Sequence, residues 1–118
     1  MAQYEDLIID QGADVAVELL LLEKDGSTKD LTGFSAAAKM KRSYNADSDN
    51  TQPFTTIIDG QTPENGRLIL ELSNTQTDLL KAGRWVYDVE ISYVDSDGDR
   101  VIERVLEGNI QVTPSVTR

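Results

Sequence analysis

The stretch RWVYDVEISYV, residues 84–94, decides the fold class because large apolar side chains occupy every second position. Successive side chains of a β-strand point to opposite sides, so this alternation predicts a strand with one buried face. Aromatic side chains on a strand of this period more often pack in a core than form a carbohydrate-stacking surface, and we interpret them as core. The predicted core face carries Trp85, Tyr87, Val89, Ile91 and Tyr93.

The next segment, VDSDGDRV at residues 94–101, places three carboxylates around one glycine. An EF-hand calcium loop needs a small residue at its sixth position and a glutamate at its twelfth, where this chain has Arg100 and Leu106. Asp97-Gly98 between two alternating strands is instead a strong hairpin signal. The segment therefore predicts a hairpin turn and no dedicated metal site. Weak cation binding is the alternative for Asp95, Asp97 and Asp99.

Period-two patterns predict further strands at residues 15–22, 34–42, 54–59, 66–73 and 100–114. The first of these is apolar on both faces in its second half, which predicts that it enters a sheet interior. In the last, Val101 and Val105 break the alternation, which predicts a bulge or a second covered face.

Residues 34–42, FSAAAKMKR, admit two interpretations. Ala, Met, Lys and Arg are good helix formers, so a helix is the alternative. A strand is favoured because Lys and Met alternate with period two and the flanking strands need a neighbour. Its two faces would carry Phe34, Ala36, Ala38 and Met40 on one side and Ser35, Ala37, Lys39 and Lys41 on the other.

The one helical signal is SNTQTDLLKAG at residues 73–83. Ser73 and Gln76 have the spacing of a capping box, and Gly83 is placed to end the helix. About two turns are too short to be stable alone, so we expect Leu79 or Leu80 to anchor the helix across an open end of the sheet.

Together these signals predict an all-β protein. The expected fold is an antiparallel β-sandwich of about seven to eight strands, immunoglobulin-like or jelly-roll-like, with one short helical turn. The length of 118 residues suffices for one core, so residues 1–118 are predicted to form a single domain. Asp25-Gly26 supplies another hairpin turn, and residues 43–53 form a polar loop.

Composition argues against several classes of function. The chain has no Cys and no His, so classical zinc sites, thiol nucleophiles and His-based triads are unavailable. A net charge of −10 argues against nucleic-acid binding. No apolar run reaches the roughly 18 residues of a membrane span, and the N-terminus has no secretory pattern, so cytosolic synthesis is expected. We predict no catalytic residue and no cofactor, and treat Asp88 and Glu90 as a solvated pair.

One modest basic cluster stands out in this acidic chain and is followed by an aromatic residue at the start of the polar loop. We identify these residues as candidate contacts for an acidic partner, another copy of the chain included. The alternative is an edge strand kept soluble by its lysines. The residues are Lys39, Lys41, Arg42 and Tyr44.

The order of several phrases resembles a group of small virion proteins of tailed bacteriophages. It is similar to the N-terminal β-sandwich domain of phage baseplate upper proteins and related tail-associated modules, over about residues 10–118. These phrases mark turns, caps and core positions, so they indicate fold rather than chemistry. The most telling are Asp30-Leu-Thr-Gly-Phe34, Ala82-Gly-Arg-Trp-Val-Tyr-Asp88 and Leu106-Glu-Gly108 with Val112-Thr-Pro114.

The resemblance implies a non-enzymatic structural protein of the virion, assembled in the host cytoplasm and located in the tail, baseplate or fibre-attachment region. Its partners would be other virion proteins and further copies of itself, bound through strand edges and loops. A second hypothesis is a recognition module on the virion surface. In it, the loops at residues 44–53 and 95–99 would bind a host-surface glycan, with or without calcium.

Overall fold

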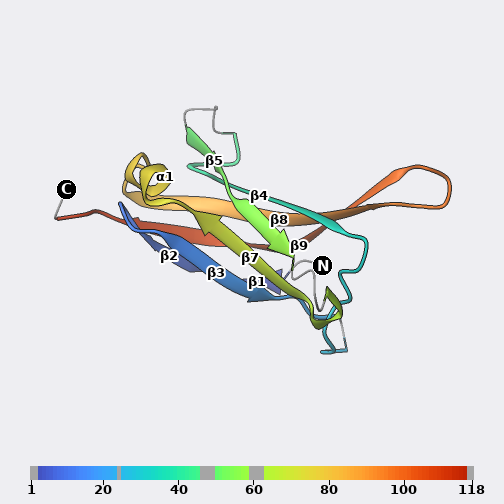
Figure 1. Cartoon of the computed structure of the whole chain (residues 1–118). Helices are drawn as coiled ribbons and strands as arrows, with labels where there is room; N and C mark the ends of the chain where they lie inside the picture. Colours follow the sequence, from blue (N-terminus) through green and yellow to red (C-terminus); the bar gives the residue numbers. More distant parts are fainter. Residues whose placement is uncertain (1–2, 24, 46–49, 59–62, 117–118) are drawn as a thin grey trace.

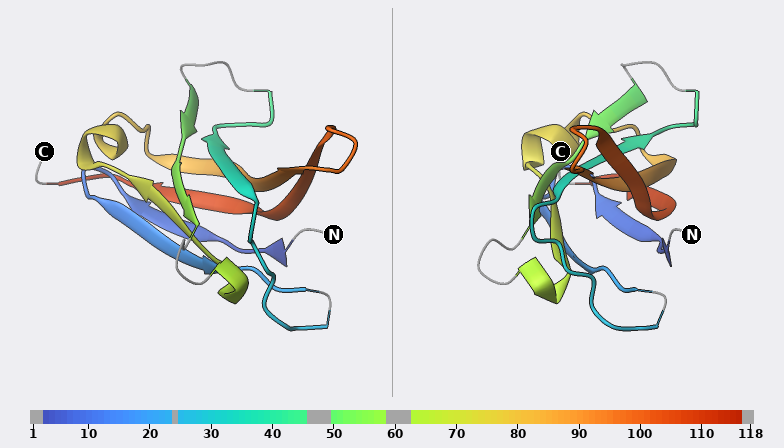
Figure 2. Two further views of the ribbon diagram at one scale, coloured as in Figure 1. Left: turned by 45° about the vertical axis from the view of Figure 1, so that its right-hand side comes forward. Right: turned by 90° about the vertical axis from the view of Figure 1, so that its right-hand side faces the viewer.

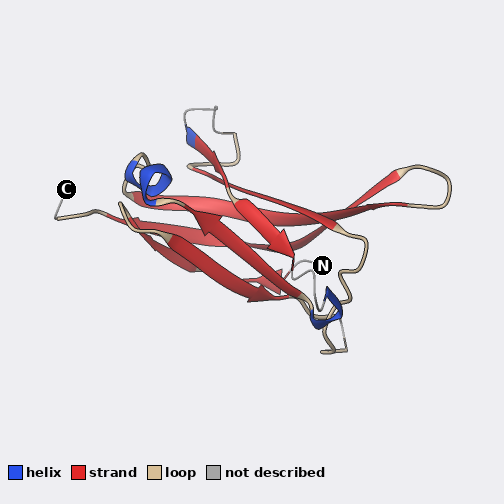
Figure 3. Ribbon diagram, in the orientation of Figure 1, coloured by secondary structure: helices blue, strands red, loops and turns tan. Residues whose placement is uncertain are grey.

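The computed structural model describes residues 3–23, 25–45, 50–58 and 63–116. Two β-sheets pack face to face in this part of the chain, and short helical segments lie at the ends of the sandwich (Figures 1 and 3). The predicted β-sandwich is therefore confirmed. None of the described helices is long and apolar enough to cross a membrane.

Sheet A has six strands. Its order is β9 (Arg100–Thr113), β8 (Gly83–Val94), β4 (Ser35–Lys41) and β5 (Thr51–Pro53), with β1 (Gln3–Tyr4) and β2 (Leu7–Asp10) both paired to the outer side of β9. Sheet B has three strands in the order β3 (Val15–Leu20), β7 (Arg67–Leu72) and β6 (Thr55–Ile58). The chain passes from sheet A to sheet B directly between β5 and β6.

The strand order is that of an immunoglobulin-like sandwich. Sheet B matches strands B, E and D of that fold, while β9, β8 and β4 match G, F and C, and β5 takes the place of C′. The N-terminal strands β1 and β2 run parallel to β9, whereas every other described pair is antiparallel. The predicted antiparallel sandwich thus has one parallel edge.

The core lies between the sheets and is built from the alternating residues. Leu68, Leu70 and Leu72 of β7 are buried against the inward face of β8. The predicted β8 core positions are buried from Trp85 to Ile91, but Tyr93 is exposed because the β8–β9 hairpin extends beyond the sandwich (Figure 1). Tyr93 packs against the Phe34 ring, with 5.1 Å between the ring centroids.

Residues 35–41 form the strand β4, so the helical alternative for this segment is wrong. Its inward positions Ala38 and Met40 are buried, as the alternation predicts. Lys39 to Lys41 pair with β5 on one side and β8 on the other. These lysines therefore do not lie on an edge strand, and that interpretation is wrong too.

The prediction for residues 15–22 is wrong in its second half. β3 pairs with β7 alone among the described strands, so it is an edge of sheet B and not an interior strand. Leu20 and Leu22 are consequently exposed, while Leu19 and Leu21 are buried in the core.

The helix α1 (Asn74–Asp78) begins with the predicted capping box between Ser73 and Gln76. Leu80 anchors it in the core, whereas Leu79 is exposed. The helix ends at Leu79 as its C-cap. Gly83 is therefore not the helix terminator that we predicted, but the first residue of β8.

The broken alternation in β9 is a β-bulge, one of the two predicted explanations. Val89 pairs with Leu106 and Glu90 with Arg104, which leaves Val105 as the extra residue of β9. Val105 and Leu106 are both buried in consequence. Beyond the bulge the alternation resumes in the opposite phase, so Arg104 and Glu107 both point outward.

Candidate interaction surface

The outward face of sheet A carries an open groove of about 370 Å³. Three of the four predicted partner contacts, Lys39, Lys41 and Tyr44, line this groove. The opposite wall comes from the outward positions of β8 and β9: Val86, Asp88, Glu90, Arg104 and Glu107. We call this surface the outer groove.

Strand register explains how the outer groove is assembled. Lys39 lies opposite Asp88 on β8, and Asp88 lies opposite Glu107 on β9. Outward residues of neighbouring strands thus form rows of charge across the sheet. Arg104 closes one row, with its Nε 3.4 Å from Asp88 Oδ2 and its Nη1 3.4 Å from Glu107 Oε2.

Arg42, the fourth predicted contact, lies away from the outer groove. Its guanidinium stacks on the Trp85 ring at 5.7 Å and its Nη1 donates to the Ala82 carbonyl at 3.1 Å. Trp85 in turn donates from Nε1 to the Lys81 carbonyl at 2.9 Å. Arg42 therefore fixes the connection between α1 and β8, which is a structural role.

Tyr44 is one of the most exposed large side chains in the described chain, with 81% of its surface accessible. The neighbouring residues 46–49 of the predicted loop lie outside the described part of the structure. The loop prediction is wrong at its C-terminal end, because residues 51–53 form the strand β5 beside β4. An exposed tyrosine beside a groove is typical of a protein-binding surface, because its ring supplies contact area at little entropic cost.

The predicted pair Asp88 and Glu90 belongs to the wall of the outer groove. Asp88 is bound to Arg104, and Glu90 lies opposite Arg104 in the strand register. Arg104 was not predicted as part of this surface from the sequence, because the alternation that would place its side chain on the outward face is interrupted at Val105.

The acidic loop forms the predicted hairpin turn. Asp95 Oδ1 accepts hydrogen bonds from the amides of Asp97 at 3.0 Å and Asp99 at 2.9 Å. Gly98 supplies the positive φ of 83° that the turn requires. Asp97 and Asp99 are exposed. Within the described ranges no group of three or more His, Cys, Asp or Glu side chains is arranged to hold a metal ion.

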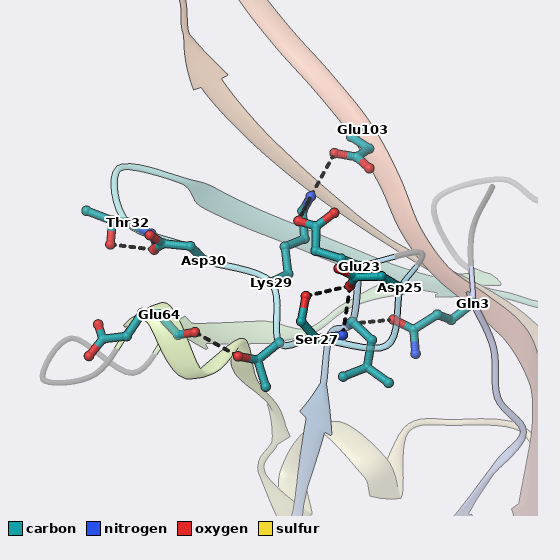
Figure 4. Close-up of polar contacts among 11 residues, drawn as sticks. Gln3, Glu23, Asp25, Ser27, Lys29, Asp30, Thr32, Glu64 and Glu103 are labelled. Atoms are coloured by element: carbon teal, nitrogen blue, oxygen red, sulfur yellow. Dashed lines mark hydrogen bonds and ion pairs between the residues drawn. The ribbon is translucent and has the colours of Figure 1, made fainter.

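A second hollow, of about 410 Å³, lies beside the connection from β3 to β4. Figure 4 shows the polar contacts around this connection. Lys29 borders the hollow and joins two parts of the fold, with its Nζ 3.3 Å from Glu23 and 3.5 Å from Glu103 on β9. The same ammonium lies 5.9 Å from the centre of the Phe34 ring. Lys29 and Phe34 thus brace the base of the β8–β9 hairpin.

Two aspartates shape the turns of this connection. Asp25 Oδ1 accepts from the Ser27 amide at 2.9 Å and hydroxyl at 2.6 Å, and Asp30 does the same with Thr32 at 2.9 and 2.6 Å. These hydrogen bonds hold the pKa of both carboxyl groups below its ordinary value. The hydrogen bonds from the hydroxyls have the larger effect, and those from the backbone amides the smaller. The predicted turn at Asp25-Gly26 is confirmed by a φ of 89° at Gly26.

No family model matches the chain, and no curated protein matches it. Among solved structures, it is similar to murine CRIg, with a TM-score of 0.49 and 17% identity over 92% of each chain. It is also similar to AggA, the major subunit of aggregative adherence fimbriae type I from Escherichia coli, with a TM-score of 0.39 and 10% identity over 97% of this chain and 91% of that one. The fold assignment rests on the strand order itself.

Proposed function

We propose that this protein is a non-enzymatic structural module of a tailed-phage particle, which binds other virion proteins through the outer groove of sheet A. The link to a phage virion rests on the sequence resemblance carried by residues 30–34, 82–88 and 106–114. The binding role rests on one structural observation: the outer groove combines an exposed tyrosine with lysines that no described carboxylate engages.

Three features of the outer groove support a protein partner. The groove is open to solvent on the outward face of sheet A, so it offers area rather than an enclosed site for a small molecule. Its floor is part of the sheet, because β4 pairs with β8 and β8 pairs with β9 on both sides of the bulge at Val105. The charged side chains of the groove are of both signs and lie in rows. Such an arrangement determines how a partner is aligned on the groove more than how tightly it binds.

The location of these groups also suits repeated assembly. A neighbouring molecule can contact the outward-facing residues of the central strands without disturbing the core on the other face of the sheet. The edge strands β3 and β6 offer additional unpaired backbone for contacts between modules.

Crosslinking in intact particles tests this proposal. Particles of the phage that encodes the chain would be treated with a lysine-reactive crosslinker and analysed by mass spectrometry. We expect Lys39 and Lys41 to crosslink to another virion protein or to a second copy of the chain, and the exposed Lys81, which does not line the groove, to serve as the reference. Absence of the chain from purified particles, or crosslinks at Lys81 alone, would contradict the proposal.

A further inference from the structure

The outer groove has positive charge that the fold itself does not use. Arg104 is engaged by Asp88 and Glu107, and Arg42 by the Trp85 ring. Among the described residues, Lys39 and Lys41 take part in no ion pair. In a chain of net charge −10, these two lysines favour an acidic partner.

The tip of the β8–β9 hairpin has the matching chemistry. Asp97 and Asp99 are exposed there, while Arg100 folds back and donates from Nη2 to Ser92 Oγ at 3.2 Å. The hairpin arms add exposed apolar surface, with Val94 68% and Ile102 56% accessible. The tip therefore presents carboxylates flanked by aliphatic side chains.

The hairpin of one copy does not reach its own groove. It extends away from the sandwich in Figure 1 and in the left view of Figure 2. β8 continues for four residues beyond Glu90, to Val94, before the turn that holds Asp97 begins, and these four residues span roughly 13 Å. A contact between tip and groove must therefore join two molecules.

We propose that the acidic tip of the β8–β9 hairpin docks into the outer groove of a second copy of this chain. Asp97 and Asp99 would pair with Lys39 and Lys41, and the aliphatic arm would pack on Tyr44. This inference rests on the proposed function as an assembly module and names its partner. Because the two surfaces differ, the contact is head-to-tail, and it generates a ring or a filament according to the rotation between copies.

Charge reversal on each side tests the contact. The groove variant is Lys39→Glu/Lys41→Glu and the tip variant is Asp97→Lys/Asp99→Lys, all at outward positions of the fold. Self-association would be followed by sedimentation and light scattering at concentrations up to the millimolar range that tethered neighbours experience. We expect the association constant of each variant alone to be about tenfold lower than that of the wild type, or lower still. An equimolar mixture should regain association, since every tip then meets a groove of opposite charge.

The matched control is Arg67→Glu/Lys81→Glu, which makes the same change in net charge at residues that do not line the groove. The Arg67–Glu18 ion pair that it removes is exposed and contributes little to stability. It should associate as the wild type does. A monomeric wild type, a mixture that does not regain association, or an equal loss in the control would each overturn the proposal. None of these results bears on crosslinks to other virion proteins in particles, so the two proposals fail separately.

Disulfide trapping gives a second measurement that does not depend on charge. The chain has no native cysteine, so when Asp97→Cys and Lys39→Cys chains are mixed and oxidised no native thiol competes, and mass spectrometry separates the mixed dimer from the two homodimers. We expect a covalent dimer of one chain of each kind. Formation of the same amount of dimer from Asp97→Cys and Lys81→Cys chains would contradict a specific contact.

Discussion

At the scale of single residues, Tyr87 and Gly108 determine how the N-terminal strands lie on sheet A. The Tyr87 hydroxyl donates to the Glu5 carbonyl at 2.6 Å, in the break between β1 and β2. Gly108 lies beneath the same carbonyl, and a Cβ at this position would collide with it. The period-two pattern predicts that Tyr87 lies in the core, but nothing in it indicates that the Tyr87 hydroxyl binds the backbone 82 residues away.

Gly108→Ala should lower the free energy of unfolding by about 1–3 kcal/mol, because the added methyl displaces the backbone at Glu5. Urea denaturation measures this loss, with the exposed neighbour Gln111→Ala as control. Equal stability of the two variants would show that β1 is not seated against Gly108.

The stability of the fold should also fall at alkaline pH through Tyr87. Burial, followed by the charges of Glu5 and Asp6, raises the pKa of the Tyr87 phenol above its ordinary value. Since the unfolded state then loses its proton first, the contribution of Tyr87 is complete below about pH 10 and decreases as the pH rises further. Tyr87→Phe should cost about 1 kcal/mol near neutrality. The difference between wild type and variant in urea denaturation should shrink near pH 11, and a constant difference would contradict the assignment.

At the scale of elements, local signals predicted most boundaries. The capping box of α1 and the glycine turns need only neighbouring residues, so they could be found in the sequence. The bulge at Val105 could be suspected but not distinguished from a second covered face. The edge position of β3 could not be predicted, because alternation shows which side of a strand is apolar and not which strands lie beside it.

The acidic hairpin turn yields a prediction that separates a structural from a metal-binding role. Asp95→Ala should destabilise the protein by about 1 kcal/mol, since two amides lose their acceptor, while Asp97→Ala should be nearly neutral. Thermal unfolding with and without millimolar calcium measures both. A melting temperature that rises sharply with calcium, and no longer does so in either variant, would favour a cation site instead.

A buried hydroxyl is one of the groups that hold the helix α1. Thr77 Oγ1 donates to the Ala13 carbonyl at 2.8 Å and accepts from the Gly12 amide at 3.1 Å, and the residue is fully buried. Thr77→Val keeps the shape but leaves both backbone groups without this partner, so a loss of about 1–3 kcal/mol is expected. The exposed Thr75→Val is the control. Hydrogen exchange should show faster exchange at Gly12 in the Thr77 variant alone.

At the scale of the whole molecule, the sequence predicted the architecture better than the site. The sandwich follows from the spacing of alternating strands. The outer groove arises only when β4, β8 and β9 align, and the alignment brings Lys39 and Lys41 near Arg104, which is far away in the sequence. Pairing of β1 and β2 with β9 in parallel is likewise a property of the assembled sheets.

The most direct test of the central claim is the copy number of the protein in purified phage particles, measured by quantitative mass spectrometry after the gene is replaced by variants. We predict a fixed copy number for the wild type and for Arg67→Glu/Lys81→Glu. Lys39→Glu/Lys41→Glu should be depleted about tenfold or more while remaining folded by circular dichroism. Incorporation of this groove variant at the wild-type level, or absence of the wild-type protein from particles, would contradict the account.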